Sequence, residues 1–197
     1  MSGRIITISR EFGSGGRTIG KETAAKLGIP CYDQELIEKI VLETGLDAEY
    51  IKEQGEYASH RSRLANAFAA RDTRGMSMQD HLWQTQYQII LQLAEQGACV
   101  IVGRCADYIL RGRAPVLPVF IHASREYRAK RIVEVYGERR ESPEKRLKDK
   151  DERRKAYYQH YTDMEWGNAA NYYVALDSGA LGIETCTDII TQIYHMN

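Results

Sequence analysis

The sequence predicts an α/β fold with three layers, in which helices cover both faces of a parallel β-sheet. Two observations carry this prediction: short apolar runs suited to buried strands, and intervening stretches in which apolar residues recur every three or four positions. Strands that alternate with helices are typical of parallel sheets. With 197 residues the chain can bury the core of one domain, so we expect a single domain over residues 1–197.

A glycine-rich segment separates the first expected strand from the first expected helix. The β-branched run at 4–8 predicts a strand. The glycines of 13–16 can continue neither a strand nor the interior of a helix. A helix is then expected to open at Thr18 and to stop at Gly28. Strand, glycine loop and helix thus follow one another in the chain.

The remaining elements are predicted from the same periodicities. They are a helix over 36–42, a helix over 82–96, a strand over 99–102, a strand over 116–121, a helix over 125–136, a strand over 172–176 and a helix over 184–195.

Two segments lack a sustained apolar face. Residues 47–75 are polar and compatible with helices, which indicates an inserted helical cap. Residues 138–163 are rich in charge and begin a helix in good order at Ser142, so we expect this lid segment to lie over solvent or over a ligand. Its tyrosines can stack on a base or pack the helix, and packing is favoured. They are Tyr157, Tyr158 and Tyr161.

Composition argues against several classes of protein. The 27 basic residues balance 27 acidic ones, so no overall field favours nucleic acid or an anionic membrane. The four cysteines have no C-x-x-C spacing, which indicates reduced thiols rather than a zinc site or a disulfide framework. No secretory leader pattern and no run of about 18 apolar residues occurs. We expect a cytoplasmic protein that does not span a membrane, with a homodimer left open.

The glycine loop is the predicted binding site for phosphate. A strand that ends in a glycine turn and opens a helix aims backbone N–H groups and the helix dipole at one point. The candidate residues are Gly13, Ser14, Gly15, Gly16, Arg17 and Thr18, and the Thr18 hydroxyl is a candidate magnesium ligand.

The loop lacks the lysine of the usual string G-x-x-x-x-G-K-[ST]. If Gly16-Arg17-Thr18 is aligned with G-K-T, Arg17 takes the place of the lysine. If the loop is aligned by its distance to Gly28 and Asp33, Gly16 takes that place, and chain geometry favours this second register. In both registers Arg17 is the nearest cation, and its guanidinium can clamp phosphate without being equivalent to lysine.

The run Ile8-Ser9-Arg10-Glu11-Phe12-Gly13-Ser14-Gly15-Gly16-Arg17-Thr18-Ile19-Gly20 resembles the cytidylate kinase-like family, relatives of bacterial cytidylate kinase. The stretches that agree elsewhere are 30–33, 100–104, 120–124, 128–129, 148–154 and 172–181. The resemblance implies a P-loop kinase fold in which an arginine-rich lid closes over a nucleoside triphosphate and a separate cap holds the acceptor. It also implies ATP and Mg²⁺ as cofactors. The chain departs from the family at the missing lysine and at Cys105, where cytidylate kinases have aspartate.

Five further residues are candidates for the chemistry. Phosphoryl transfer needs positive charge around the migrating group, which Arg153 and Arg154 of the lid can supply. Asp151 lies three residues before Arg154, where it can orient the guanidinium or hold magnesium through water, although a solvated charged helix is the alternative. Arg104 follows a buried strand and is expected to contact the acceptor phosphate. Asp33 can bind acceptor or magnesium, or cap the helix that follows.

The resulting hypothesis is an ATP-dependent phosphotransferase that acts on a nucleoside monophosphate or a similar small phosphate-bearing acceptor. Arg17, Asp151, Arg153 and Arg154 are its candidate catalytic residues. Two alternatives remain: a nucleotide or phosphate sensor that has lost catalysis, and a kinase for a non-nucleotide acceptor.

Overall fold

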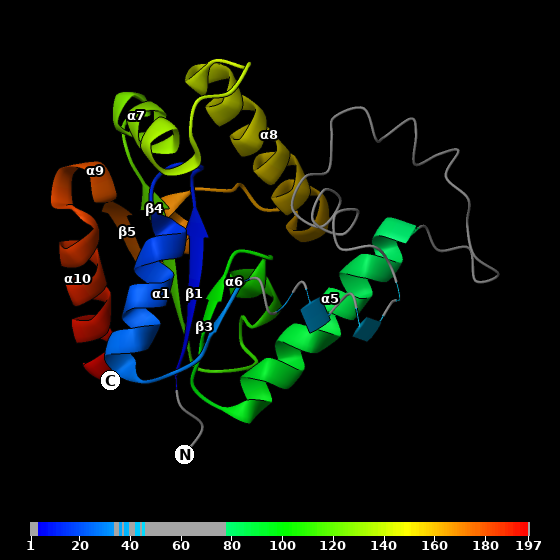
Figure 1. The fold of residues 1–197 in the computed structure, drawn as a ribbon. Coiled ribbons are helices and arrows are strands. Elements are labelled where there is room, and N and C mark those ends of the chain that lie inside the picture. The colour runs from blue at the N-terminus through cyan, green and yellow to red at the C-terminus, as the bar shows by residue number, and fades with distance from the viewer. Residues whose placement is uncertain are drawn as a thin grey trace.

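A parallel sheet forms the centre of the molecule (Figure 1). The structure is a computed structural model that describes residues 4–33 and 78–196, together with Leu36, Glu38, Lys39, Leu42, Glu43 and Gly45. Within these residues the sheet has five strands in the order β2-β3-β1-β4-β5. The strands are β1 (Ile5–Arg10), β2 (Cys31–Tyr32), β3 (Val100–Val102), β4 (Val116–His122) and β5 (Val174–Asp177).

Helices cover both faces of this sheet, as the predicted three-layer α/β fold requires (Figure 1). They are α1 (Gly16–Leu27), α5 (Met78–Gln96), α6 (Ala106–Ile109), α7 (Arg125–Tyr136), α8 (Pro143–Thr162), a short 3-10 helix (Ala169–Asn171), α9 (Ser178–Leu181) and α10 (Ile183–His195). None of the helices in the described residues is long and apolar enough to cross a membrane.

The two faces of β1 explain how the layers are held together. Successive residues of a strand point to opposite faces. Ile8 therefore joins Ile19 of α1 and Ile190 of α10 in one buried cluster. Ile5 points the other way and joins Ile89 of α5 in a second cluster. Helices α7 and α8 lie beyond the carboxyl ends of the strands (Figure 1). Both therefore lie next to the edge of the sheet at which open α/β folds bind their ligands.

Most predicted boundaries agree with the structure, and three differences are informative. Helix α1 begins at Gly16 rather than at Thr18, because Gly15 in left-handed conformation caps it directly. Strand β5 pairs with β4 only from Val174, since Tyr172 still belongs to the end of the 3-10 helix. The predicted cap over 47–75 and most of the helix over 36–42 lie outside the described residues.

The third difference from the prediction is the burial of the lid segment, which was expected to lie over solvent or over a ligand and instead packs closely against the protein. Helix α8 buries Leu147, Tyr157 and Tyr158 at helical spacing, together with Arg146 and Arg154. The buried face is therefore made of arginine and tyrosine side chains, whose apolar parts pack while their polar ends bond. A hydrophobicity pattern does not register such a face.

The packing of α10 against the sheet yields a test of the fold. Ile190 is completely buried, so Ile190→Ala is expected to lower the free energy of unfolding by roughly 2–5 kcal/mol, and Ile190→Val by roughly 0.5–1.5 kcal/mol. Urea unfolding followed by far-ultraviolet circular dichroism measures both. Equal losses for the two variants would show that α10 does not pack in this way.

Candidate active site

The glycine loop leaves β1 and enters α1 through two glycines in left-handed conformation. Gly13 has φ 83° and Gly15 has φ 84°, a region that other residues rarely adopt. A Cβ atom on Gly13 would lie 2.8 Å from Ile132 Cγ2, and one on Gly15 would overlap Ile183 Cδ1. Both glycines are thus required by conformation and by packing. The amides of the first turn of α1 have no partners within their helix and form the start of an anion-binding site.

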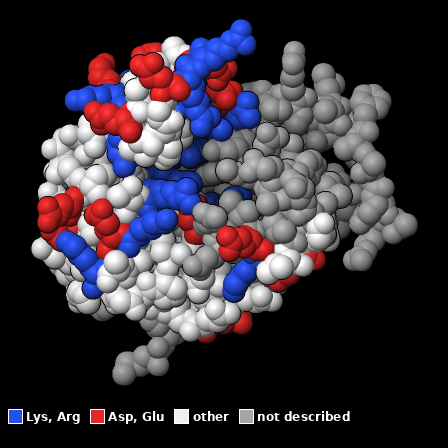
Figure 2. Space-filling view, in the orientation of Figure 1, with Lys and Arg blue, Asp and Glu red and all other residues white. Residues whose placement is uncertain are grey.

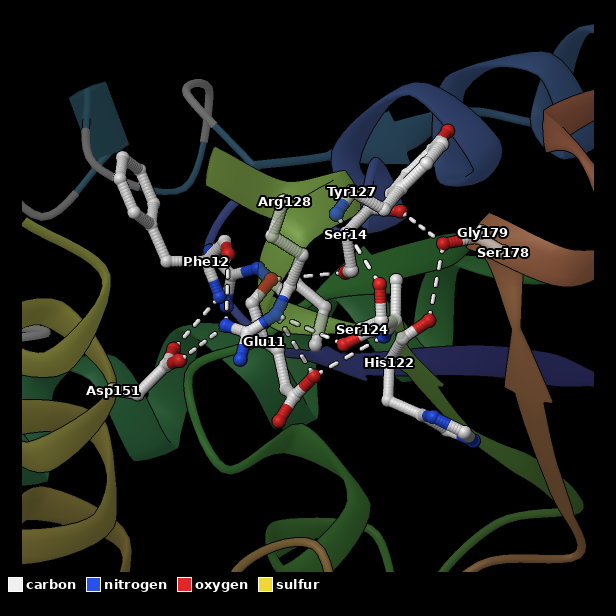
Figure 3. Close-up of polar contacts among 12 residues, drawn as sticks. Glu11, Phe12, Ser14, His122, Ser124, Tyr127, Arg128, Asp151, Ser178 and Gly179 are labelled. Atoms are coloured by element: carbon white, nitrogen blue, oxygen red, sulfur yellow. Dashed lines mark hydrogen bonds and ion pairs between the residues drawn. The ribbon is translucent and has the colours of Figure 1, made fainter. Parts of the chain in front are cut away.

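A buried ion cluster holds this loop from one side (Figure 3). Arg128 of α7 contacts Asp151 of α8 at 2.5 Å (Nη1 to Oδ2) and Glu11 of the loop at 3.3 Å (Nε to Oε2). Its Nη1 also donates to the Phe12 carbonyl, while the Phe12 amide donates to Asp151 Oδ1 at 2.7 Å. Glu11 in turn accepts from the amide of Ala123. The loop, α7 and α8 are therefore tied together at one point.

Two serines hold the loop from the opposite side (Figure 3). The buried Ser178 hydroxyl lies 2.5 Å from the Ser14 carbonyl and 3.1 Å from the His122 carbonyl. Ser14 Oγ donates to the Glu11 carbonyl within the loop. The backbone conformation of the loop is thus fixed by β4, α9 and its own side chains.

The lid residues predicted to be catalytic occupy different surroundings. Arg154 is buried; its Nη1 donates to the Arg10 carbonyl, and its guanidinium lies 5.7 Å from the centre of the Phe12 ring. Arg153, one position earlier, forms an ion pair with Asp149 on the exposed side of α8. Asp151 is engaged mainly by Arg128 and lies 4.0 Å from Arg154. Arg154 thus reaches the loop.

Arg17 and Asp33, predicted separately for donor and acceptor, form an ion pair between α1 and the end of β2. Arg17 is about half exposed, whereas Asp33 is mostly covered. Whether Asp33 also caps a following helix lies outside the described residues. The pair places Arg17 toward the end of β2.

Arg131 of α7 is a site residue that the sequence reasoning missed. Its Nη2 donates to Thr18 Oγ1 at 3.1 Å, and its guanidinium carbon lies 3.4 Å from the position of a Cβ on Gly15. A signal for it existed, because Arg128 and Arg131 are three residues apart and therefore share one face of a helix.

A pocket opens where β1 and β3 end, beside the glycine loop. Its lining residues are Ser9, Arg10, Gly103, Arg104, Cys105, Arg154, Tyr157, Tyr158 and Trp166. Three of these carry guanidinium groups. Figure 2 shows the molecule in the orientation of Figure 1, and Lys and Arg side chains gather in the middle of that face, below the surface formed by α7 and α8. Positive charge around a hollow favours an anionic ligand.

Arg104 lies in this pocket, as its position after β3 predicts. Only 4% of it is exposed, and its Nη1 is buried without a hydrogen-bond partner among the described residues. Arg104 and Cys105 have φ values of 61° and 53°, which is uncommon for residues other than glycine. Backbone strain and an unsatisfied buried donor both occur where a ligand completes the site.

The tyrosines of α8 pack within the protein, as favoured above. The Tyr158 hydroxyl lies 2.6 Å from the buried carboxyl of Asp107. Burial raises the pKa of Asp107 above its ordinary range and is also the main cause of the raised pKa of Tyr158. Tyr161 stacks on Trp83 of α5 with ring centres 4.2 Å apart. Gln86 of α5 adds hydrogen bonds to Tyr157 and to the Arg104 carbonyl.

The side chains that could hold magnesium are few. Within the described residues no group of three or more His, Cys, Asp or Glu side chains lies close enough to bind a metal ion. Mg²⁺ in kinases uses one or two protein oxygens together with substrate phosphates, so this is compatible with a nucleotide-bound ion. The Thr18 hydroxyl fits such a role once it is released by Arg131.

Solved structures with the same architecture identify the fold. A shikimate kinase from Acinetobacter baumannii is 15% identical with a TM-score of 0.55, covering 97% of this chain and 92% of that chain. A gluconokinase from Sinorhizobium meliloti is 15% identical with a TM-score of 0.54, covering 98% and 94%. The parallel sheet and its helices thus form the P-loop kinase fold.

The chain belongs to the cytidylate kinase-like family, whose model matches residues 5–180. An uncharacterized protein from Eubacterium ventriosum is more similar than the kinases above: it is 27% identical with a TM-score of 0.74, covering 98% of this chain and 99% of that chain. A search of the curated proteins finds no match.

The ion cluster makes a prediction for stability. Arg128→Met leaves two partly buried carboxylates facing each other, so the free energy of unfolding is expected to fall by roughly 3–5 kcal/mol. Arg153→Met breaks a partly exposed ion pair with Asp149 and is expected to change the free energy of unfolding by less than about 1 kcal/mol. Urea unfolding compares the two. A loss for Arg128→Met as small as that for Arg153→Met would contradict the role of the cluster.

The buried Asp107 predicts a dependence on pH. Because its folded pKa is raised, the folded protein holds this proton more tightly than the unfolded chain, and stability from this group falls as pH rises above about 4. Asp107→Asn removes the titration. Its unfolding free energy relative to wild type should therefore increase with pH and then level off. Urea unfolding between pH 4 and pH 8 measures the difference, which a constant value would refute.

Proposed function

We propose that this protein is an ATP-dependent phosphotransferase that moves the γ-phosphoryl group to a small acceptor, with a nucleoside monophosphate as the first candidate. One observation carries the proposal: a glycine loop at the start of a helix faces guanidinium groups from α7, α8 and the end of β3. Phosphoryl transfer depends on positioning and on positive charge around the migrating group, which such an arrangement supplies.

The donor side of the proposed site is the glycine loop. Its amides and the N-terminus of α1 hold the phosphates of ATP, with Arg131 as a nearby cation and Arg17 available if it leaves its pair with Asp33. Magnesium would neutralise charge on the donor phosphates, with Thr18 as the nearest hydroxyl. Arg154 approaches the loop from α8, which supports a role for it beside the migrating group. Arg153, which pairs with Asp149 in this structure, is the second candidate on α8 for this role.

The acceptor side of the proposed site lies at the ends of β2 and β3. Arg104 presents an unsatisfied buried Nη1 to the pocket, which suits the phosphate or carboxylate of an acceptor. Asp33 is close to Arg17, so it is suited to orient that guanidinium or to accept a hydrogen bond from the acceptor hydroxyl. The predicted cap over 47–75, which the sequence suggests for the acceptor, lies outside the described residues.

Two alternative functions are each supported by a specific observation. The missing lysine and the direct bond between Asp151 and the loop suit a sensor in which nucleotide binding moves α8 without transfer. A pocket lined by arginine and tyrosine also suits an anionic acceptor that is not a nucleotide. In each case we place the protein in the cytoplasm, where ATP is available and thiols stay reduced.

The proposal predicts turnover that depends on the acceptor. Protein incubated with ATP and Mg²⁺ should release ADP faster when one of a panel of nucleoside monophosphates or small hydroxylated acids is added. A coupled assay for ADP measures the rate, and calorimetry measures ATP binding. If ATP binds but no acceptor raises turnover above background, the sensor is the better account. If ATP does not bind, both accounts fail.

A further inference from the structure

Gly16 is a glycine for a reason different from that of its neighbours. Gly13 and Gly15 need positive φ, whereas Gly16 begins α1 and is not among the glycines with positive φ. A Cβ on Gly16 would lie 2.5 Å from Cβ of Arg10 and 3.0 Å from its Cγ. These are the stiff first atoms of that side chain, so they cannot easily give way. Arg10 therefore occupies the space in which a side chain at position 16 would begin.

The far end of the Arg10 side chain rests on another glycine. A Cβ on Gly103 would overlap Nη1 of Arg10 and lie 3.0 Å from its guanidinium carbon. Arg10 thus runs from the end of β1, past the start of α1, to the end of β3. It lines the same pocket as Arg104 and Arg154. The absence of side chains at Gly16 and Gly103 leaves space for the extended side chain of Arg10.

The spacing of Arg10 and Gly16 matches that of the first glycine and the lysine in the usual string. In G-x-x-x-x-G-K the first glycine lies six residues before the lysine, and Arg10 lies six residues before Gly16. This register makes Gly15 the second glycine, in agreement with its position as the left-handed cap of α1. The chain thus has a cation where the string has glycine, and a glycine where it has the cation.

Arg17, the cation nearest in sequence, points elsewhere in this structure. It forms its ion pair with Asp33 and is about half exposed.

We propose that Arg10 and Gly16 have exchanged roles, so that Arg10 is the residue that binds the outer phosphates of the nucleotide. The inference rests on the proposed function, because it identifies the cation of the same donor site. Arg10 reaches the phosphates from beneath the loop rather than along α1. Its planar guanidinium can bind two phosphate oxygens in a fixed bidentate geometry, whereas the lysine ammonium acts as a point charge.

The exchange is tested by reversing it. Arg10→Gly is expected to weaken binding of ATP with Mg²⁺ roughly 10- to 100-fold, as loss of a charged hydrogen-bonding group does. Gly16→Lys alone is expected to weaken it as well, because its side chain collides with Arg10. The double variant Arg10→Gly with Gly16→Lys restores the G-x-x-x-x-G-K part of the usual string, with Arg17 where the string has Ser or Thr, and is expected to bind within about fivefold of wild type. Calorimetry measures each dissociation constant.

Matched controls separate charge from folding. Arg113→Gly removes an exposed arginine just before β4, at the opposite edge of the sheet, and is expected to leave ATP affinity unchanged. Thermal unfolding identifies variants that fail to fold. Arg10→Met keeps the packing against Gly16 while removing the charge, so it replaces Arg10→Gly if that variant is unfolded.

The outcomes distinguish the inference from the function on which it rests. If wild type does not bind ATP, the proposed function falls and the inference with it. If wild type binds and a folded Arg10 variant stays within threefold, the inference alone is overturned. A folded double variant that binds no better than either single variant also overturns it, whereas rescue supports it.

Discussion

The buried guanidinium of Arg128 is the interaction on which the rest of the site depends. A charge in a covered position must be compensated, and here Glu11 and Asp151 compensate it from two different parts of the chain. Asp151 also accepts from the Phe12 amide. The glycine loop, α7 and α8 therefore share a single electrostatic centre, and the positions of Arg131 and Arg154 relative to the loop follow from it.

The layers of the fold were predictable because aliphatic residues at strand and helix spacing mark buried faces directly. The bounds of α7 coincide with the prediction because a serine cap leaves little freedom, and β3 lacks only Cys99, the first residue of the predicted apolar run. The buried face of α8 was not predictable in this way. Arg146, Arg154 and Tyr158 are buried through hydrogen bonds as much as through apolar contact, and partners distant in sequence decide that.

The candidate site was predictable in location and less so in detail. Parallel strands end at one edge, so Arg104 and the glycine loop had to lie near each other. Sequence spacing does not tell which of Arg153 and Arg154 faces the loop, because neighbouring residues of a helix point about 100° apart. Nor does it show that Arg17 pairs with Asp33, or that Arg10 fills the space left by Gly16, since both depend on packing between separate elements.

The two tryptophans of the chain give it an optical consequence. Trp166 lines the arginine pocket and meets Phe120 edge-on, whereas Trp83 is stacked on Tyr161 between α5 and α8. An anion that enters the pocket changes the polarity around the first indole, and a displacement of α8 changes the stacking of the second. The intrinsic fluorescence of the protein thus contains two reporters, one for occupancy and one for the position of the lid, which single Trp→Phe variants separate.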